Sequence, residues 1–333
     1  MHSTAKKMKV ALIGVSHWHT GFYLDPLMEM AHVEVCGISD PDPSVVDSFK
    51  KRIGCIGLTD YRALCDSLKP DFVVVLGRHC DMASTAQYLI DEGIAFAIEK
   101  PCGMNAIEVA AIAANAKKKS VFAAVPLVMR HGPFVQQLSQ ILRQEEATYA
   151  TFRFIAGSAS RYLQSGCTWM LDPLQSGGGC TINLGVHFFD LACMILGPNA
   201  KVSSSLMSND AWKYPIEDYS AVTIMLNNKS VLIETGYLYP APTNHFDMHY
   251  SIRTNKHYLT AWGPMNLEIR DYEGHSVNHS ISTTNVPHYV DFMHDTLDRF
   301  SKSQEPLAGL GAMLDSMYLI DQAYQLSQPL TVK

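Results

Sequence analysis

The sequence lacks the features that mark several classes of protein. Its 333 residues include 26 Lys and Arg against 32 Asp and Glu, a formal net charge of −6, so no excess of basic residues is available to bind nucleic-acid phosphates. No apolar stretch approaches the ~20 residues needed to cross a bilayer. Residues 1–9 also lack the apolar stretch of a signal peptide. We therefore expect a cytoplasmic protein that binds neither nucleic acid nor a membrane.

The cysteines lack a ligand-like or disulfide-like spacing. None of the eight forms a Cys-x-x-Cys pair with another. Several lie in apolar runs, such as Val35-Cys36 and Ala192-Cys193, where a free thiol behaves as a small hydrophobic group. This distribution favours reduced thiols over a disulfide framework or a zinc site. We expect no bound metal.

What the sequence does contain, in its first part, is a repeated alternation of short apolar strands and helices. Strands are expected near residues 10–13, 33–39, 72–76, 95–98 and 121–125, and helices near residues 20–31, 44–52, 82–92 and 105–119. Uniformly apolar strands separated by helices are typical of a parallel sheet covered on both faces. Residues 1–128 are therefore predicted to form a doubly wound parallel α/β domain.

The pattern changes after about residue 130. Strand candidates now dominate, at residues 148–155, 201–207, 219–227, 230–238, 247–254 and 257–262, with helices at 133–143, 180–196, 288–302 and 309–326. Polar turns such as Asn227-Asn228 separate several of the strands, which indicates a mostly antiparallel sheet. Residues 129–333 are therefore predicted to form a second α/β domain around an open, mostly antiparallel sheet.

The segment from Ile13 to Gly21 lies between the first strand and the first helix. A dinucleotide-binding turn needs this setting, a glycine at the tight turn and a close approach of the backbone to pyrophosphate. Gly14 supplies the first glycine, whereas Ser16 and His19 stand at the second and third glycine positions. His17 and His19 are suited to contact a cofactor or a substrate. A metal is disfavoured there, because no partner carboxylate or cysteine accompanies the two histidines.

An acidic residue, Asp40, follows the second strand in Ser39-Asp40-Pro41. A carboxylate in this position accepts hydrogen bonds from the adenosine ribose and repels a 2′-phosphate, so NAD is favoured over NADP. The alternative is that Asp40 only begins a turn before Pro41.

Two further segments carry candidate chemistry. Lys100, in Glu99-Lys100-Pro101, stands at the end of a strand, where the ligand crevice of a doubly wound sheet lies, and is suited to polarise a hydroxyl. Asn183 and His187 follow the triple glycine at 177–179 and are four residues apart, so they share one face of a helix. A histidine near its free pKa of ~6.5 is suited to take a hydroxyl proton.

Together these segments resemble the Gfo/Idh/MocA family, named for glucose–fructose oxidoreductase, inositol dehydrogenase and a rhizopine catabolism protein. The likeness runs from about residue 8 to 328 and is carried mainly by Glu99-Lys100-Pro101 and by the triple glycine leading to Gly185-x-His187. The family implies a Rossmann domain followed by a substrate domain, and an NAD(P)-dependent enzyme acting on CH–OH groups of sugars or polyols. It also implies a homodimer or homotetramer.

The resemblance further implies site residues. Lys100 would contact the nicotinamide ribose and the reacting hydroxyl, His187 would be the general base or acid, and Arg130 and Trp169 fall near substrate-lining positions. Lys100, Asn183 and His187 would also bind the substrate. The cofactor-binding positions would be Gly14, Val15, Ser16, His17, Trp18, His19, Asp40, Leu76, Gly77, Arg78, His79, Glu99 and Lys100.

The chain departs from the family pattern in two places. Asn183 stands where the family usually has Asp, and an amide cannot stabilise an imidazolium as a carboxylate does. Gly77-Arg78-His79 replaces the usual Thr-Pro-Asn, and Met82 replaces the following His. Arg78 or His79 would then reach the nicotinamide end or the substrate.

Three functions remain open at this point. The first is an NAD-dependent dehydrogenase of a sugar, cyclitol or sugar acid, with His187 taking the proton and Lys100 stabilising the oxyanion. The second is an NAD-dependent, redox-neutral glycosidase, for which His79, Tyr162 and His245 are spare candidate bases. The third is a non-catalytic, cofactor-binding sensor on the same fold.

Overall fold

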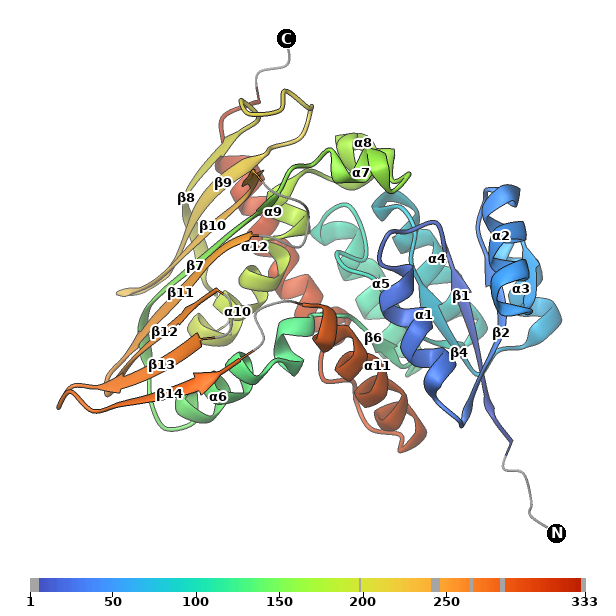
Figure 1. The fold of residues 1–333 in the computed structure, drawn as a ribbon, viewed down its shortest axis with the longest axis horizontal. Helices are drawn as coiled ribbons and strands as arrows, with labels where there is room; N and C mark the ends of the chain where they lie inside the picture. The colour runs from blue at the N-terminus through green and yellow to red at the C-terminus, as the bar shows by residue number, and fades with distance from the viewer. Residues whose placement is uncertain (1–5, 198, 241–245, 264–265, 282–284, 331–333) are drawn as a thin grey trace. The chain divides into compact units, whose positions relative to one another are not determined.

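The computed structural model describes residues 6–197, 199–240, 246–263, 266–281 and 285–330. The chain folds into two compact units (Figure 1): Met1–Pro126 with Tyr289–Gly311, and Leu127–His288 with Ala312–Lys333. Residues 289–311 thus belong to the first unit. The predicted division into residues 1–128 and 129–333 assigns this segment to the second domain instead.

The first unit contains a six-stranded sheet in the order β3-β2-β1-β4-β5-β6, in which every pairing is parallel. Its strands are β1 (Met8–Ile13), β2 (Val33–Ser39), β3 (Ile56–Leu58), β4 (Phe72–Val75), β5 (Ala95–Ile98) and β6 (Ala123–Ala124). Its helices are α1 (Thr20–Glu29), α2 (Pro43–Ile53), α3 (Tyr61–Leu68), α4 (His79–Glu92) and α5 (Ala106–Lys119), joined by most of α11 (Val286–Ser301). The predicted doubly wound parallel sheet is confirmed.

Local chemistry explains why these helices begin and end where they do. The carboxylates of Asp42 and Asp60 accept backbone N–H groups at the starts of α2 and α3, and the side chain of Asn105 does the same for α5. Gly93 ends α4 in the left-handed conformation. Helices α2 and α3 pack against β2 and β3, and α4 packs against β4 and β5. The residues of β1, β4 and β5 are almost entirely buried.

The second unit contains an eight-stranded sheet in the order β14-β13-β12-β11-β7-β10-β9-β8. Its strands are β7 (Ala147–Gly157), β8 (Lys201–Ser208), β9 (Tyr219–Leu226), β10 (Lys229–Tyr239), β11 (Phe246–Thr254), β12 (His257–Trp262), β13 (Asn266–Asp271) and β14 (Ser276–Ser280). Only β7 and β10 pair in parallel, so the prediction of a mostly antiparallel sheet is confirmed.

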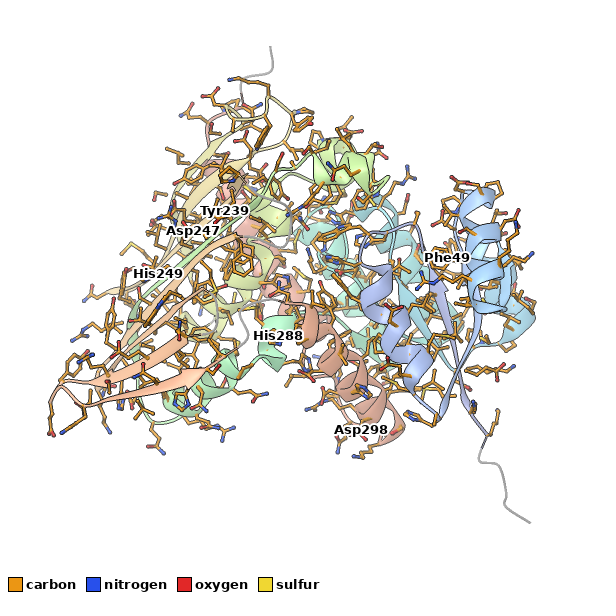
Figure 2. All side chains as sticks on the ribbon, viewed as in Figure 1. Phe49, Tyr239, Asp247, His249, His288 and Asp298 are labelled. Carbon is orange, nitrogen blue, oxygen red and sulfur yellow. The ribbon has the colours of Figure 1, made fainter. Side chains whose placement is uncertain are left out.

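One face of this sheet is covered by helices. These are α9 (Cys180–Asn183), α10 (Val186–Leu196) and α12 (Leu310–Leu326) (Figure 1). Tyr250 of β11 packs against Phe188 of α10, so the alternating residues Asp247 and His249 lie on the opposite face of the sheet (Figure 2). The unit also contains α6 (Pro133–Leu142), α7 (Arg161–Gln164), α8 (Pro173–Ser176) and the 3-10 turns η1 (Val128–His131) and η2 (Thr168–Leu171).

One expected element is wrong in a way that matters for the site. The single helix predicted over 180–196 is two helices, α9 and α10, separated at Leu184 and Gly185. A Cβ on Gly185 would lie 2.2 Å from the backbone oxygen of Thr181, so the chain turns there by a tight approach that only glycine permits. Asn183 and His187 therefore stand on different helices rather than on one helical face.

No single helix among the described residues is long and apolar enough to cross a membrane. The segment Pro173–Asn183 and α10, which are bent by 52°, together reach that length and composition. Most residues of α10 are buried inside the second unit.

Candidate active site

Several of the predicted nucleotide-binding residues lie at the carboxyl ends of the strands of the parallel sheet. Gly14 follows β1, Asp40 follows β2, Leu76 and Gly77 follow β4, and Glu99 and Lys100 follow β5. The strand order reverses between β1 and β4, and doubly wound sheets bind ligands at the carboxyl ends of the strands beside such a reversal.

Gly14 holds the turn after β1 against the backbone that follows β4. Its φ is +77°, and a Cβ built on it would lie 2.7 Å from the backbone of Leu76 and of Gly77. The Leu76 N–H donates to the Ile13 oxygen at 2.8 Å, so this close approach is fixed by the sheet. Glycine is required here both for its conformation and for the space.

Gly14→Ala is expected to lower the free energy of unfolding by about 2–5 kcal/mol, from ~1–2 kcal/mol for the left-handed backbone and ~1–3 kcal/mol for the overlap with backbone atoms. Urea unfolding measures the change. Gly93→Ala is the matched control, because its φ is +69° and nothing lies within 4 Å of its added Cβ. An equal loss in the two variants would mean that the approach of Leu76 and Gly77 contributes nothing.

The Asp40 carboxylate is buried and organises the same turn. Its Oδ2 accepts the Ser16 N–H at 2.7 Å, and its Oδ1 accepts the Asp42 N–H at 3.0 Å. Asp40 therefore forms a turn with the residues that follow it, and this turn does not decide between the two interpretations of Asp40. The predicted contact with a ribose stays a prediction, and it would use the remaining acceptor capacity of the same carboxylate.

Glu99 connects several elements of the first unit. Its side chain is 0% exposed; Oε1 is bonded to His19 Nδ1 and accepts the hydroxyls of Tyr23 at 3.0 Å and Tyr289 at 3.2 Å. Oε2 accepts the backbone N–H of Lys100 at 2.7 Å. Burial opposes its charged form, but the charge and hydrogen bond of His19 hold the pKa of Glu99 well below its usual range. Glu99 thereby ties the turn, α1 and α11 to Lys100.

His17 is a neutral imidazole with a defined tautomer. Its Nδ1 accepts the backbone N–H of His19 at 3.1 Å, so the ring proton resides on Nε2. Burial, and next the charge of His19, hold the pKa of His17 well below its usual value. The turn after β1 therefore contains an N–H donor that carries no charge at neutral pH.

The other predicted residues of the first unit differ in exposure. Val15, Leu76, His79 and Lys100 are buried, Trp18 is half-buried with its ring 3.8 Å from that of His19, and Ser16 is exposed. Arg78 is also exposed, and its Nε bonds to Asp81 Oδ2 at 2.6 Å. Whether Arg78 or His79 reaches a ligand stays a prediction.

In the second unit, Asn183 belongs to a buried polar network. Its Nδ2 donates to the hydroxyl oxygens of Tyr162 at 2.6 Å and Tyr237 at 2.9 Å. Arg161 Nη2 donates to the Tyr162 oxygen at 2.9 Å, and its guanidinium lies 4.9 and 5.1 Å from the two ring centroids. Burial, and next Tyr162, raise the pKa of Tyr237 well above its usual value. Tyr237 is therefore a neutral hydrogen-bonding group, and the hydroxyls of Tyr162 and Tyr237 together hold the Asn183 amide in place.

The remaining predicted residues of this unit lie on separate elements. His187 is buried in the first turn of α10. Arg130, in η1, makes a two-pronged pair with the buried Asp190, with Nε–Oδ2 at 2.9 Å and Nη2–Oδ1 at 2.6 Å, whereas Trp169 in η2 is half-buried. Roles for Arg130 and Trp169 in substrate binding stay predictions.

Family models decide the relationship of the chain to known proteins. Residues 8–126 match the oxidoreductase family with an NAD-binding Rossmann fold, and residues 137–256 match the GFO/IDH/MocA C-terminal domain. The chain belongs to the Gfo/Idh/MocA oxidoreductase family. The resemblance drawn from Glu99-Lys100-Pro101 and Gly185-x-His187 is confirmed.

Individual relatives of this Gfo/Idh/MocA protein are more distant. A protein of Amycolatopsis mediterranei (strain S699), provisionally named UDP-kanosamine synthase oxidoreductase subunit, is 25% identical over 213 residues, which are 62% of this chain and 58% of that protein. An oxidoreductase from Agrobacterium radiobacter, in complex with NAD+, L-tartaric acid and magnesium, has a TM-score of 0.83 at 17% identity over 96% of each chain. KijD10, a 3-ketoreductase from Actinomadura kijaniata in complex with NADP and TDP-benzene, has a TM-score of 0.81 at 14% identity, covering 98% of this chain and 100% of that one. These two structures share the fold.

Sequence reasoning missed several polar residues that this Gfo/Idh/MocA chain places around the predicted ones. They are Tyr23 and Tyr289 at Glu99, and Arg161 and Tyr237 at Asn183. Each of these residues lies far in the sequence from the predicted residue that it accompanies, so the spacing of residues in the sequence does not predict their proximity. Of the spare bases considered for a glycosidase, His79 and Tyr162 are buried, and His245 lies outside the described residues.

Proposed function

We propose that this Gfo/Idh/MocA protein is an NAD-dependent enzyme that oxidises a secondary alcohol, or reduces the corresponding ketone, of a sugar, cyclitol or sugar derivative. The observation that supports this most directly is the Glu99 network, in which one buried carboxylate fixes both the turn after β1 and the backbone of Lys100. The relatives named for UDP-kanosamine synthesis and 3-ketoreduction favour a sugar or nucleotide-sugar substrate.

The residues of the first unit fit a dinucleotide. Gly14 leaves a cradle that a Cβ would fill, and α1 begins directly after the turn, with His19 as an N-cap residue whose side chain makes no capping hydrogen bond. Phosphate oxygens bind at such helix starts. Gly14 to His19 would hold the pyrophosphate, and Asp40 the adenosine ribose. The Asp40 carboxylate favours NAD over NADP, since a 2′-phosphate beside it would add a like charge.

The proposed reaction removes a hydride and a proton from one CH–OH group and leaves a ketone. Bound NAD+ would supply the hydride acceptor. Lys100 donates a hydrogen bond to the hydroxyl oxygen and stabilises the charge that develops on it. His187 takes the hydroxyl proton, and returns it when the ketone is reduced. Asn183 would act through a hydrogen bond rather than as a second anion, since it is an amide.

Purified protein is mixed with NAD+ or NADP+ and a panel of polyols, free sugars, nucleotide sugars and aryl glycosides, and NADH absorbance and released aglycone are recorded together. With a polyol, sugar or nucleotide sugar, we expect NADH to accumulate from NAD+ and NADPH to accumulate more slowly from NADP+, while the glycosides stay intact.

Two results would contradict this proposal. Aglycone release that needs NAD+ but yields no net NADH would establish a redox-neutral glycosidase. Tight NAD+ binding without turnover of any compound, in either direction, would favour a cofactor-binding sensor.

A further inference from the structure

Glu217 is a fully buried carboxyl group that the proposed reaction does not use. It lies just before β9, and its Oε1 accepts three hydrogen bonds: the backbone N–H groups of Gly179 and Thr181 at 2.9 Å each, and the hydroxyl of Tyr324 at 2.7 Å. The Cys180 N–H also donates to the Glu217 backbone oxygen at 3.1 Å. The glycine loop before α9, the start of α9 and helix α12 are thus all bonded to one atom, the Oε1 of Glu217.

Two residues of the triple glycine, Gly178 and Gly179, must be glycine because Glu217 and Tyr324 lie against them. A Cβ on Gly178 would lie 2.0 Å from the Tyr324 hydroxyl oxygen, and a Cβ on Gly179 would lie 2.1 Å from the Glu217 backbone oxygen. Any side chain at either position would displace Glu217 or Tyr324. Gly178 and Gly179 therefore leave the space in which Glu217 and Tyr324 contact the start of α9.

Helix α9 cannot hold its own position. It is four residues long, and its N-cap, Gly179, has no side chain with which to satisfy the first N–H groups. A single helical turn is not stable by itself in water. Glu217 supplies the missing acceptor from outside the helix, at the end opposite to Asn183, and Gly185 then directs the chain into α10 and His187.

We infer that Glu217, together with Tyr324, is a positioning residue that sets the locations of Asn183 and His187. Its consequence for catalysis rests on the proposed function, whereas its consequence for the two side chains does not. The carboxyl group acts as a hydrogen-bond acceptor, so glutamine, which keeps an oxygen for the same donors, is expected to replace it.

The test compares Glu217→Ala, Glu217→Gln and Tyr324→Phe with Glu145→Ala. Glu145 is the matched control because it is a carboxylate of the same unit that also accepts hydrogen bonds, from Thr254 and His257 at the β11–β12 turn. Protein labelled at histidine and asparagine is observed by NMR, with the His187 ring and Asn183 side-chain signals assigned by their loss in His187→Gln and Asn183→Asp. kcat and KM are measured on the substrate found in the panel.

We expect Glu217→Ala to move both signals and to lower kcat about 10- to 100-fold, the range that a displacement of about 1 Å produces. Tyr324→Phe should cause a smaller change of the same kind, and it serves if the alanine variant does not fold. Glu217→Gln should stay within about threefold of wild type, and Glu145→Ala should move neither signal.

Unchanged Asn183 and His187 signals in both Glu217→Ala and Tyr324→Phe would overturn the inference. A glutamine variant as impaired as the alanine variant would also overturn it, because an acceptor oxygen for the same three donors would then not be enough to position α9. Shifted signals in a protein that turns over no substrate would leave the positioning role standing and remove the proposed function.

Discussion

Lys100→Ala is expected to lower kcat by about 10²- to 10³-fold or more, the cost of removing one donor that stabilises a developing oxyanion. The fold should persist, because the bond from the residue 100 N–H to Glu99 is a backbone contact that alanine retains. The effect should fall mainly on kcat, since an interaction strongest in the transition state adds little to ground-state binding. Steady-state kinetics measure it, with the NAD+ dissociation constant obtained separately by fluorescence titration.

Lys119→Ala is the control for this variant. Lys119 lies in the same unit and pairs with Asp91 at 2.6 Å, with both side chains about half exposed, and such surface pairs contribute ~0–1 kcal/mol to stability. Its kinetics should match wild type. Full activity in Lys100→Ala would remove Lys100 from the mechanism, whether the enzyme is a dehydrogenase or a glycosidase.

Glu99→Ala is expected to lower the free energy of unfolding by about 3–5 kcal/mol, the usual cost of removing one partner from a buried ion pair. The change leaves His19, Tyr23 and Tyr289 without the buried acceptor that they share. Urea unfolding at pH 7 measures the loss. Glu92→Ala, at an exposed site on α4, should change stability by less than about 0.5 kcal/mol.

Acid titration gives the same Glu99 contact an independent check. The pKa of Glu99 in the folded protein lies below its value of ~4.3 in the unfolded chain, so its charge stabilises the fold above that value. This contribution declines as the pH falls through ~4 toward the folded pKa. The stability difference between wild type and Glu99→Gln should therefore narrow between about pH 5 and pH 3. A constant difference over that range would show that Glu99 does not act through its charge.

The parallel sheet could be predicted because its strands carry their signal locally. β1, β4 and β5 are runs of apolar residues, each followed by a helix, and that pattern has few other solutions. β3 was missed because it has only three residues, one of them Gly57, and β13 and β14 because they form a polar hairpin at the sheet edge. Short or polar strands cannot be predicted from the local sequence pattern, because they form only by pairing with a neighbouring strand.

The site was predictable only as far as motifs extend. Gly14, Glu99 and Lys100 were placed correctly at strand ends, but nothing near Glu99 in the sequence indicates Tyr289, which is 190 residues away. The break at Gly185 was also hidden, because glycine is tolerated inside helices and the obstructing Thr181 oxygen is visible only in three dimensions. Hydrogen-bond partners that only the tertiary structure brings together cannot be recognised from the spacing of residues in the sequence.

The return of residues 289–311 to the first unit has a consequence for the evolution of the chain. Phe300 in that segment packs against Phe72 and Phe122 at 5.3 and 5.5 Å, and Tyr289 bonds to Glu99. A gene segment encoding only residues 1–128 would lack these partners and would leave aromatic surface uncovered. A gene fragment that transfers this unit whole must therefore carry two separate stretches of coding sequence, one for residues 1–126 and one for residues 289–311.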